Sequence, residues 1–267
     1  MNNDFRNIKL VATDMDGTFV KEGMFELPEE DFDLIRKLNE HGVIFAAASG
    51  RPYGNMRRMF APVADDMLFI CDNGCNVMWH GKNIYTHPMN LSACREIADY
   101  IQTLPPEYEN VMCTADNYVM MPKRDEDAVT VLRRWNMSVR IVSGLENVVD
   151  DVLKISIFKP GGIEREFIDE MKRRWSGKVR YVTESCSEWL DFQDGDKGNA
   201  LKIAAEQLGI DLADTAAFGD GNNDIEMLKT AGYGFAMSSA CDEVKAHARY
   251  ECSDVRTVLR EILAQHK

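Results

Sequence analysis

Short apolar runs alternate with amphipathic segments at the start of the chain. Residues 8–13 (IKLVAT) and 43–48 (VIFAAA) are mainly apolar and each ends in a polar loop, as expected of parallel strands covered on both faces. Residues 28–41 lie between them and combine an acidic first turn with apolar positions on one face. This pattern predicts a helix that ends at Gly42. A further short strand is predicted at residues 68–71.

The same alternation returns near the C-terminus. Strands are predicted at residues 215–218 and 232–236, and helices at residues 198–208, 223–230 and 254–265. Strands that alternate with helices in this way are typical of an α/β fold with a doubly wound, Rossmann-like parallel sheet.

The middle of the chain follows another pattern, in which strands and helices do not alternate regularly. Helices are predicted at 91–103, 125–135 and 163–175, and strands at 117–122, 139–142, 152–158 and 179–183. About a hundred residues of this kind are enough for an independent α+β domain. We therefore predict a discontinuous core domain, residues 1–82 and 190–267, with a cap domain inserted at residues 83–189.

Composition and charge narrow the class of protein. The chain has 267 residues, of which 45% are hydrophobic and 28% charged, and a net charge of −13. A polyanion repels nucleic acid and anionic membranes. The seven cysteines form no Cys-x-x-Cys pair, and neither a signal peptide nor a membrane span is evident. We expect a cytoplasmic protein with free thiols, monomeric or weakly self-associating.

Polar clusters follow the predicted core strands. They are DMDGT at residues 14–18, SGR at 49–51 and GDGNND at 219–224, and a fourth cluster is KG at 197–198. Each alone could be a simple turn. In open α/β sheets, however, ligands bind beyond the carboxyl ends of the strands, where such loops converge. We expect the four clusters to form one site.

Other kinds of site fit the sequence less well. A calcium loop of the EF-hand type needs glycine at its sixth position and glutamate at its twelfth, but counting from Asp220 these positions hold Ile225 and Ala231. The five histidines have no metal-ligand spacing, and neither a Gly-x-Ser-x-Gly elbow nor a Walker-type phosphate loop is present.

The ordered set of clusters resembles the haloacid-dehalogenase-like hydrolase superfamily. The long insertion between Ser49 and Lys197 resembles the type IIB cap of that superfamily. DNG at residues 72–74 and KGNAL at 197–201 are similar to the Cof-type sugar-phosphate phosphatases. The resemblance implies a Mg²⁺-dependent phosphatase of small phosphorylated metabolites, sugar phosphates foremost.

The chemistry of phosphoryl transfer is compatible with these residues. An anionic nucleophile attacks an anionic phosphoryl group only if cations neutralise both. Asp14, Asp16 and Asp220 could supply the oxygen ligands that Mg²⁺ prefers, and Lys197 could add a fixed positive charge.

The resemblance also assigns roles to individual residues. Asp14 is the expected nucleophile, which becomes an aspartyl phosphate, and Asp16 the expected general acid and base. The expected phosphate-binding residues are Met15 (through its amide), Ser49, Gly50, Lys197 and Asn223. The expected metal ligands are Asp14, Asp16 (through its carbonyl), Asp220 and Asp224. Thr18 is expected to stabilise its turn, and Arg51 to start a helix or contact the cap.

Two alternatives share these core motifs. A phosphomutase of the same cap type would return the phosphoryl group to a second hydroxyl of the bound sugar, and a non-catalytic protein would only bind a phosphometabolite. A pure binder has no need of Asp16 two residues from a nucleophile. A mutase needs a cationic pocket for a second phosphate, but no cluster of basic residues stands out in a predicted cap loop. The basic residues on predicted cap helices, such as Arg133, Arg134 and Lys172, are expected to face solvent.

Overall fold

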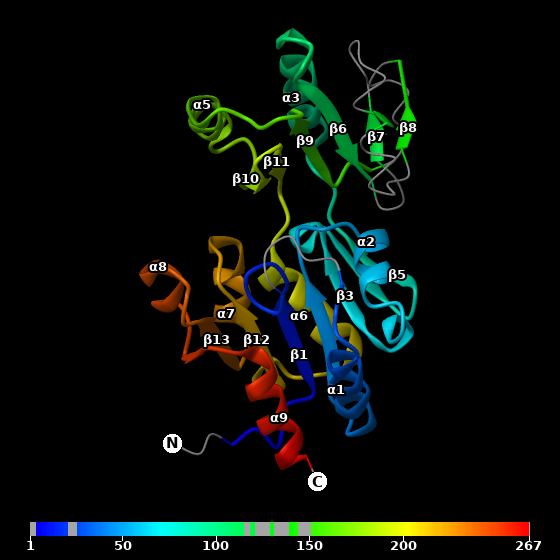
Figure 1. The fold of residues 1–267 in the computed structure, drawn as a ribbon, viewed down its shortest axis with the longest axis vertical. Helices are drawn as coiled ribbons and strands as arrows, with labels where there is room; N and C mark the ends of the chain where they lie inside the picture. The colour runs from blue at the N-terminus through cyan, green and yellow to red at the C-terminus, as the bar shows by residue number, and fades with distance from the viewer. Residues whose placement is uncertain are drawn as a thin grey trace. The chain divides into compact units, whose positions relative to one another are not determined.

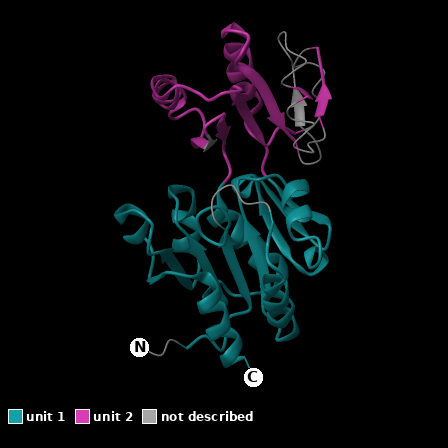
Figure 2. Cartoon of the chain, in the orientation of Figure 1, with its two compact units in different colours: residues 1–86, 196–267 teal, residues 87–195 magenta. Residues whose placement is uncertain are grey.

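The computed structural model describes residues 4–20, 26–114, 118–120, 129–130, 139–143 and 151–266. The described chain forms two compact units, which we call unit 1 (residues 1–86 and 196–267) and unit 2 (residues 87–195) (Figure 2). Unit 2 begins and ends a few residues later than the expected cap at residues 83–189. Its end lies later because residues 189–193 form a strand of its sheet. No described helix is long and apolar enough to cross a bilayer.

Unit 1 is built on an eight-stranded sheet with the strand order β14-β13-β12-β1-β2-β3-β4-β5 (Figure 1). Strands β14 to β3 run parallel to their neighbours in this order, and β4 and β5 add an antiparallel hairpin at one edge. The strands are β1 (Leu10–Asp14), β2 (Ile44–Ala48), β3 (Leu68–Cys71), β4 (Asn76–Trp79), β5 (Lys82–Thr86), β12 (Thr215–Gly219), β13 (Tyr233–Met237) and β14 (Tyr250–Cys252).

Helices cover both faces of this sheet, so the doubly wound α/β architecture is confirmed. Side chains that alternate along β1 enter two separate apolar clusters, Val11 in one and Leu10 in the other. The first cluster is packed by α1 (Glu29–Glu40), α2 (Tyr53–Met59) and α9 (Val255–Gln265). The second is packed by α6 (Lys197–Leu208), α7 (Ile225–Thr230) and α8 (Asp242–Lys245).

Local sequence explains where the unit 1 helices begin and end. Pro28 precedes α1, and Glu29, Glu30 and Asp31 occupy the first turn, where negative charge is favourable. The N-cap of α6 is Asp196, whose side chain accepts hydrogen bonds from the Gly198 and Asn199 amides.

Unit 2 contains a six-stranded sheet with the order β10-β11-β9-β6-β7-β8. All of its neighbouring pairs are antiparallel except β7 and β8. Its strands are β6 (Glu109–Cys113), β7 (Tyr118–Met120), β8 (Val139–Ile141), β9 (Lys154–Phe158), β10 (Tyr181–Cys186) and β11 (Trp189–Gln193). Helices α3 (Leu91–Thr103) and α5 (Arg165–Trp175) pack on one face of this sheet. The helix expected at 125–135 lies mainly outside the described residues, as do Arg133 and Arg134.

Candidate active site

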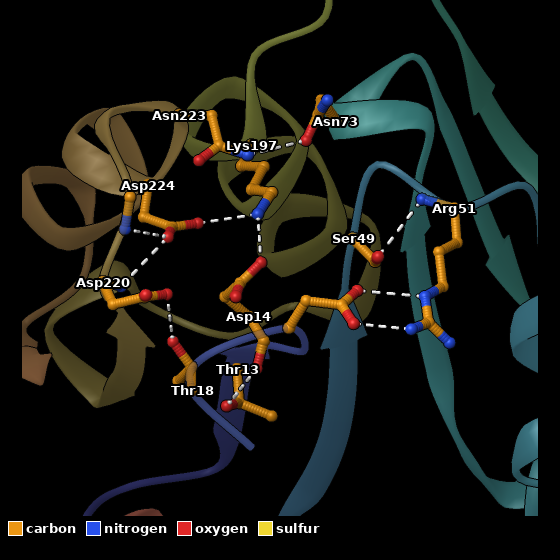
Figure 3. A network of polar contacts seen from close by, with 12 residues as sticks. Thr13, Asp14, Thr18, Ser49, Arg51, Asn73, Lys197, Asp220, Asn223 and Asp224 are labelled. Carbon is orange, nitrogen blue, oxygen red and sulfur yellow. Dashed lines mark hydrogen bonds and ion pairs between the residues drawn. The ribbon is translucent and has the colours of Figure 1, made fainter. Parts of the chain in front are cut away.

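Four loops of unit 1 leave neighbouring parallel strands at the same edge of the sheet. They follow β12, β1, β2 and β3, and they begin at Asp220, Met15, Ser49 and Asp72. The strand register places Asp14 directly beside Ala48. Because parallel strands present their carboxyl ends at one edge, residues more than 200 positions apart in sequence meet here (Figure 3).

Lys197 reaches this edge from the first turn of α6. The start of α6 packs closely against α7 because Gly198 has no side chain, and a Cβ at that position would lie 2.4 Å from the carbonyl oxygen of Glu226. The Lys197 side chain is 1% exposed. Its ammonium donates hydrogen bonds to Asp14 Oδ1 at 2.6 Å and to Asp224 Oδ1 at 2.7 Å. Lys197 therefore holds a nucleophile candidate and a metal-ligand candidate with one buried positive charge.

Three carboxylates gather around the end of β1. Oxygens of Asp14, Asp220 and Asp224 lie within 4.8 Å of one another. Asp224 is tied down on both sides, since its second oxygen accepts hydrogen bonds from the amides of Asp220 (3.1 Å) and Gly221 (3.0 Å). The second oxygens of Asp14 and Asp220 are better placed to take a cation.

The loop after β1 fits closely against Asp220. Thr18 Oγ1 donates a hydrogen bond to Asp220 Oδ1 at 2.8 Å. Gly17 has φ +90°, and a Cβ there would lie 2.5 Å from Asp220 Oδ2. Gly17 is required both by its left-handed backbone and by the space that the Asp220 carboxylate occupies.

The electrostatics of the cluster favour a bound cation. Burial, followed by the negative charge of Asp224, raises the pKa of Asp14 to about 8, although Lys197 acts in the opposite direction. Burial also raises the pKa of Asp220. One lysine does not balance three carboxylates, and hard oxygen ligands of this kind suit Mg²⁺. The residues present thus fit a divalent cation.

Asp16 does not join this carboxylate cluster through its side chain. Arg51 binds both of its oxygens, Oδ1 at 2.5 Å and Oδ2 at 3.0 Å. Arg51 stands just before α2, as expected for a residue at a helix start, but its salt bridge to Asp16 was not predicted. Charge-assisted contacts of this two-pronged kind fix the plane and position of a carboxylate.

The expected phosphate-binding residues lie on the loops around Asp14. Ser49 is buried, and its Oγ accepts a hydrogen bond from the Arg51 amide at 3.1 Å. Asn223 Nδ2 donates to Asn73 Oδ1 at 2.9 Å. Met15 follows Asp14 directly, with its side chain buried in the core of unit 1. Asn73 lies in the DNG turn at residues 72–74, and no role was predicted for it from the sequence.

The chain is similar to known hydrolases over most of its length. The model of a family described as haloacid dehalogenase-like hydrolase matches residues 11–257. The 5-amino-6-(5-phospho-D-ribitylamino)uracil phosphatase YbjI of Escherichia coli is 28% identical over 249 residues, which cover 91% of this chain and 90% of the relative.

Solved structures share the fold over nearly the whole chain. A crystal structure from Eubacterium rectale is 27% identical, with a TM-score of 0.81 over 95% of this chain and 98% of the other. A subclass IIB sugar phosphatase, BT4131, is 21% identical, with a TM-score of 0.73 over 94% and 98%. At 21% identity, the similarity to BT4131 shows a shared fold only.

Proposed function

The chain belongs to the haloacid dehalogenase-like hydrolases and is a phosphatase of small phosphorylated metabolites, and we propose that it hydrolyses sugar or sugar-alcohol phosphates through an aspartyl phosphate on Asp14. The observation that carries the proposal is the contact of the Asp14 carboxylate with the buried ammonium of Lys197 at 2.6 Å. A buried cation beside a carboxylate reduces the repulsion that an anionic phosphoryl group would otherwise meet.

In the first step, an oxygen of Asp14 attacks phosphorus and the ester bond to the leaving oxygen breaks. Asp16 gives a proton to that leaving alkoxide, which requires its acid form, with one of its oxygens released from Arg51. In the second step, the Asp16 carboxylate takes a proton from a water molecule as the water attacks phosphorus. The bond between phosphorus and Asp14 then breaks, which releases inorganic phosphate and regenerates the Asp14 carboxylate.

The surrounding residues would hold the charged group in place. Lys197, the Ser49 hydroxyl and the amides of Met15 and Gly50 would bind phosphate oxygens, with Asn223 as a further donor. Asp14, Asp220 and the Asp16 carbonyl would hold Mg²⁺, which when bound neutralises charge on the phosphoryl oxygens. Asp224 would orient Lys197 and the metal-binding loop, since both of its oxygens already accept hydrogen bonds.

The proposed substrate class and the proposed reaction type each have one line of support. The curated relative named above acts on a phosphorylated ribityl compound, which is a sugar-alcohol phosphate. In addition, basic residues of unit 2 lie against acidic partners: Lys154 beside Asp191, Lys159 beside Glu164, and Lys172 beside Glu184. In the described part of unit 2, these ion pairs occupy lysines that could otherwise bind a second phosphate, which favours hydrolysis over a mutase reaction.

The test is turnover against a panel of hexose 1-phosphate, hexose 6-phosphate and ribityl phosphate compounds, with Asp14→Asn as the matched inactive variant. We expect stoichiometric phosphate release that needs no sugar bisphosphate activator. Isomerised hexose phosphate in large excess over free phosphate would instead support the mutase. Phosphate-ester binding without any turnover would support the non-catalytic binder.

A further inference from the structure

The turn that follows β3 has an unusual backbone. Asp72, Asn73 and Gly74 have φ values of 49°, 51° and 97°. Residues that carry a Cβ disfavour this left-handed region, and two of them in succession are rare. Such a conformation persists only where the surroundings impose it, and it occurs often at functional sites. The contacts around this turn should therefore show what holds it in this conformation.

On one side, the turn is bonded to the loop after β2. The Asn73 amide donates to the Ser49 carbonyl at 2.9 Å, and the Asp72 amide donates to the Arg51 carbonyl at 3.2 Å. The turn makes these bonds in its left-handed conformation. They fix its position relative to Ser49, which is proposed to bind phosphate.

On another side, the turn lies against the start of α6. A Cβ on Gly74 would lie 2.4 Å from the Asp196 carbonyl oxygen and 2.9 Å from the Lys197 nitrogen. The turn therefore meets the backbone that presents Lys197, with no room for a side chain between them.

The Asn73 side chain makes the third contact, with the loop after β12. Asn73 is 4% exposed, and its Oδ1 accepts a hydrogen bond from Asn223 Nδ2 at 2.9 Å (Figure 3). The same amide group covers Gly50, since a Cβ on Gly50 would lie 3.0 Å from Asn73 Nδ2. Asn73 thus lies between the Asn223 side chain and the Gly50 backbone, two donors that come from different loops.

From these contacts we infer that Asn73 is a positioning residue of the phosphate site, which holds the Asn223 amide and the Gly50 backbone at the separation that one phosphate group requires. The inference rests on the proposed function, because that function assigns Asn223 and Gly50 to phosphate. Asn73 acts through its neighbours. Its loss should weaken the binding of any phosphate monoester, and of inorganic phosphate itself, whatever the leaving group.

The experiment compares Asn73→Gly, Asn223→Ala and the double variant. Glycine is the informative substitution because it removes the side chain and still tolerates φ +51°. The matched control is Asn83→Ala, which removes another hydrogen bond between asparagines, from Asn83 Nδ2 to Asn76 Oδ1 at 2.7 Å in the β4–β5 hairpin. The measurements are the competitive Ki of inorganic phosphate, together with kcat and KM for a hexose 6-phosphate.

We expect each single variant to raise Ki and KM about tenfold, the effect of losing one hydrogen bond to a charged ligand, with a smaller change in kcat. The double variant should match Asn73→Gly, because the Asn223 amide contributes only in the arrangement that Asn73 holds. The Asn83→Ala control should match the wild type.

The inference would be overturned if Asn73→Gly bound phosphate as the wild type does, or if the two single effects multiplied in the double variant. In both cases a wild-type enzyme with normal turnover would leave the proposed function standing. A wild-type protein that neither hydrolyses phosphate esters nor binds phosphate would refute the proposed function and this inference together.

Discussion

Replacing Lys197 with methionine should destabilise unit 1 strongly when no metal is present. The substitution keeps most of the side-chain volume but removes the charge that contacts Asp14 at 2.6 Å and Asp224 at 2.7 Å. At an effective dielectric constant of about 20, one such contact attracts by about 6 kcal/mol before desolvation is subtracted. Removing one partner from a buried ion pair costs about 3–5 kcal/mol net, and we expect a loss in that range.

The loss should depend on pH. The folded-state pKa of Asp14 is about 8, above its ordinary value of 3.8, so the folded protein binds more protons than the unfolded chain between these two values. Stability from this group therefore falls as pH rises through that window. Without Lys197 the ionised carboxylates have no cation, so the loss should be larger at pH 9 than at pH 5.5. Saturating Mg²⁺ should restore part of it.

The assay is denaturant-dependent hydrogen exchange of the amides in β1 and α6, which reports on unit 1 alone. The control is Lys154→Met, which removes a second buried lysine, paired with Asp191 at 3.0 Å in unit 2. This control should weaken protection in β9 and β11 and leave the Mg²⁺ response of unit 1 unchanged. A Lys197→Met variant within about 1 kcal/mol of the wild type at pH 9 without Mg²⁺, or an equal loss at both pH values, would refute the reasoning.

Three further outcomes follow from the site. Activity should disappear after EDTA treatment and return with Mg²⁺ but poorly with Ca²⁺, whose longer bonds and higher coordination number suit the carboxylates less well; steady-state rates at matched free metal check this. Arg51→Ala should lower kcat about tenfold, because the position of Asp16 is no longer fixed, and should change the Ki of phosphate little. Arg51→Lys should not restore kcat, because lysine cannot make the two-pronged contact. An unchanged kcat in Arg51→Ala would contradict this role. Gly17→Ala should weaken Mg²⁺ binding by calorimetry, since its Cβ would meet Asp220 at 2.5 Å; wild-type affinity would show that the loop adapts freely.

Elements with strong local signals could be predicted from the sequence alone. Helix α1 lies within its expected range because Pro28 and the acidic first turn mark its start. Helix α3 covers the expected residues 91–103, with Asn90 as its N-cap. The buried parallel strands were predictable because mainly apolar runs ended at polar loops.

Elements that depend on distant partners could not be predicted in this way. The β4–β5 hairpin mixes apolar and polar residues without a regular alternation, and β4 is held by its pairing with β3. Strand β6 begins with the polar residues Glu109 and Asn110, which are buried and give no apolar pattern. Strand β11 contains buried Asp191 and Gln193 and so gives no apolar pattern, and its residues 190–193 were assigned to the core domain.

In the candidate site, the loops could be predicted from the sequence but the contacts between them could not. The loops were predictable because each carries a compact motif directly after a strand. The contacts between loops were not, since Asp16 and Arg51 are 35 residues apart and Asn73 and Asn223 are 150 apart. No local pattern indicates such pairs, and only the convergence of strand ends brings them together.

The central claim is that Asp14 carries the phosphoryl group during turnover. The most direct measurement is a rapid acid quench of the enzyme with radiolabelled substrate, followed by peptide mapping. The account predicts label on the peptide that contains Asp14, lost on treatment with hydroxylamine as expected of an acyl phosphate and absent from Asp14→Asn. Phosphate release at the normal rate with no label on that peptide at any quench time would contradict it.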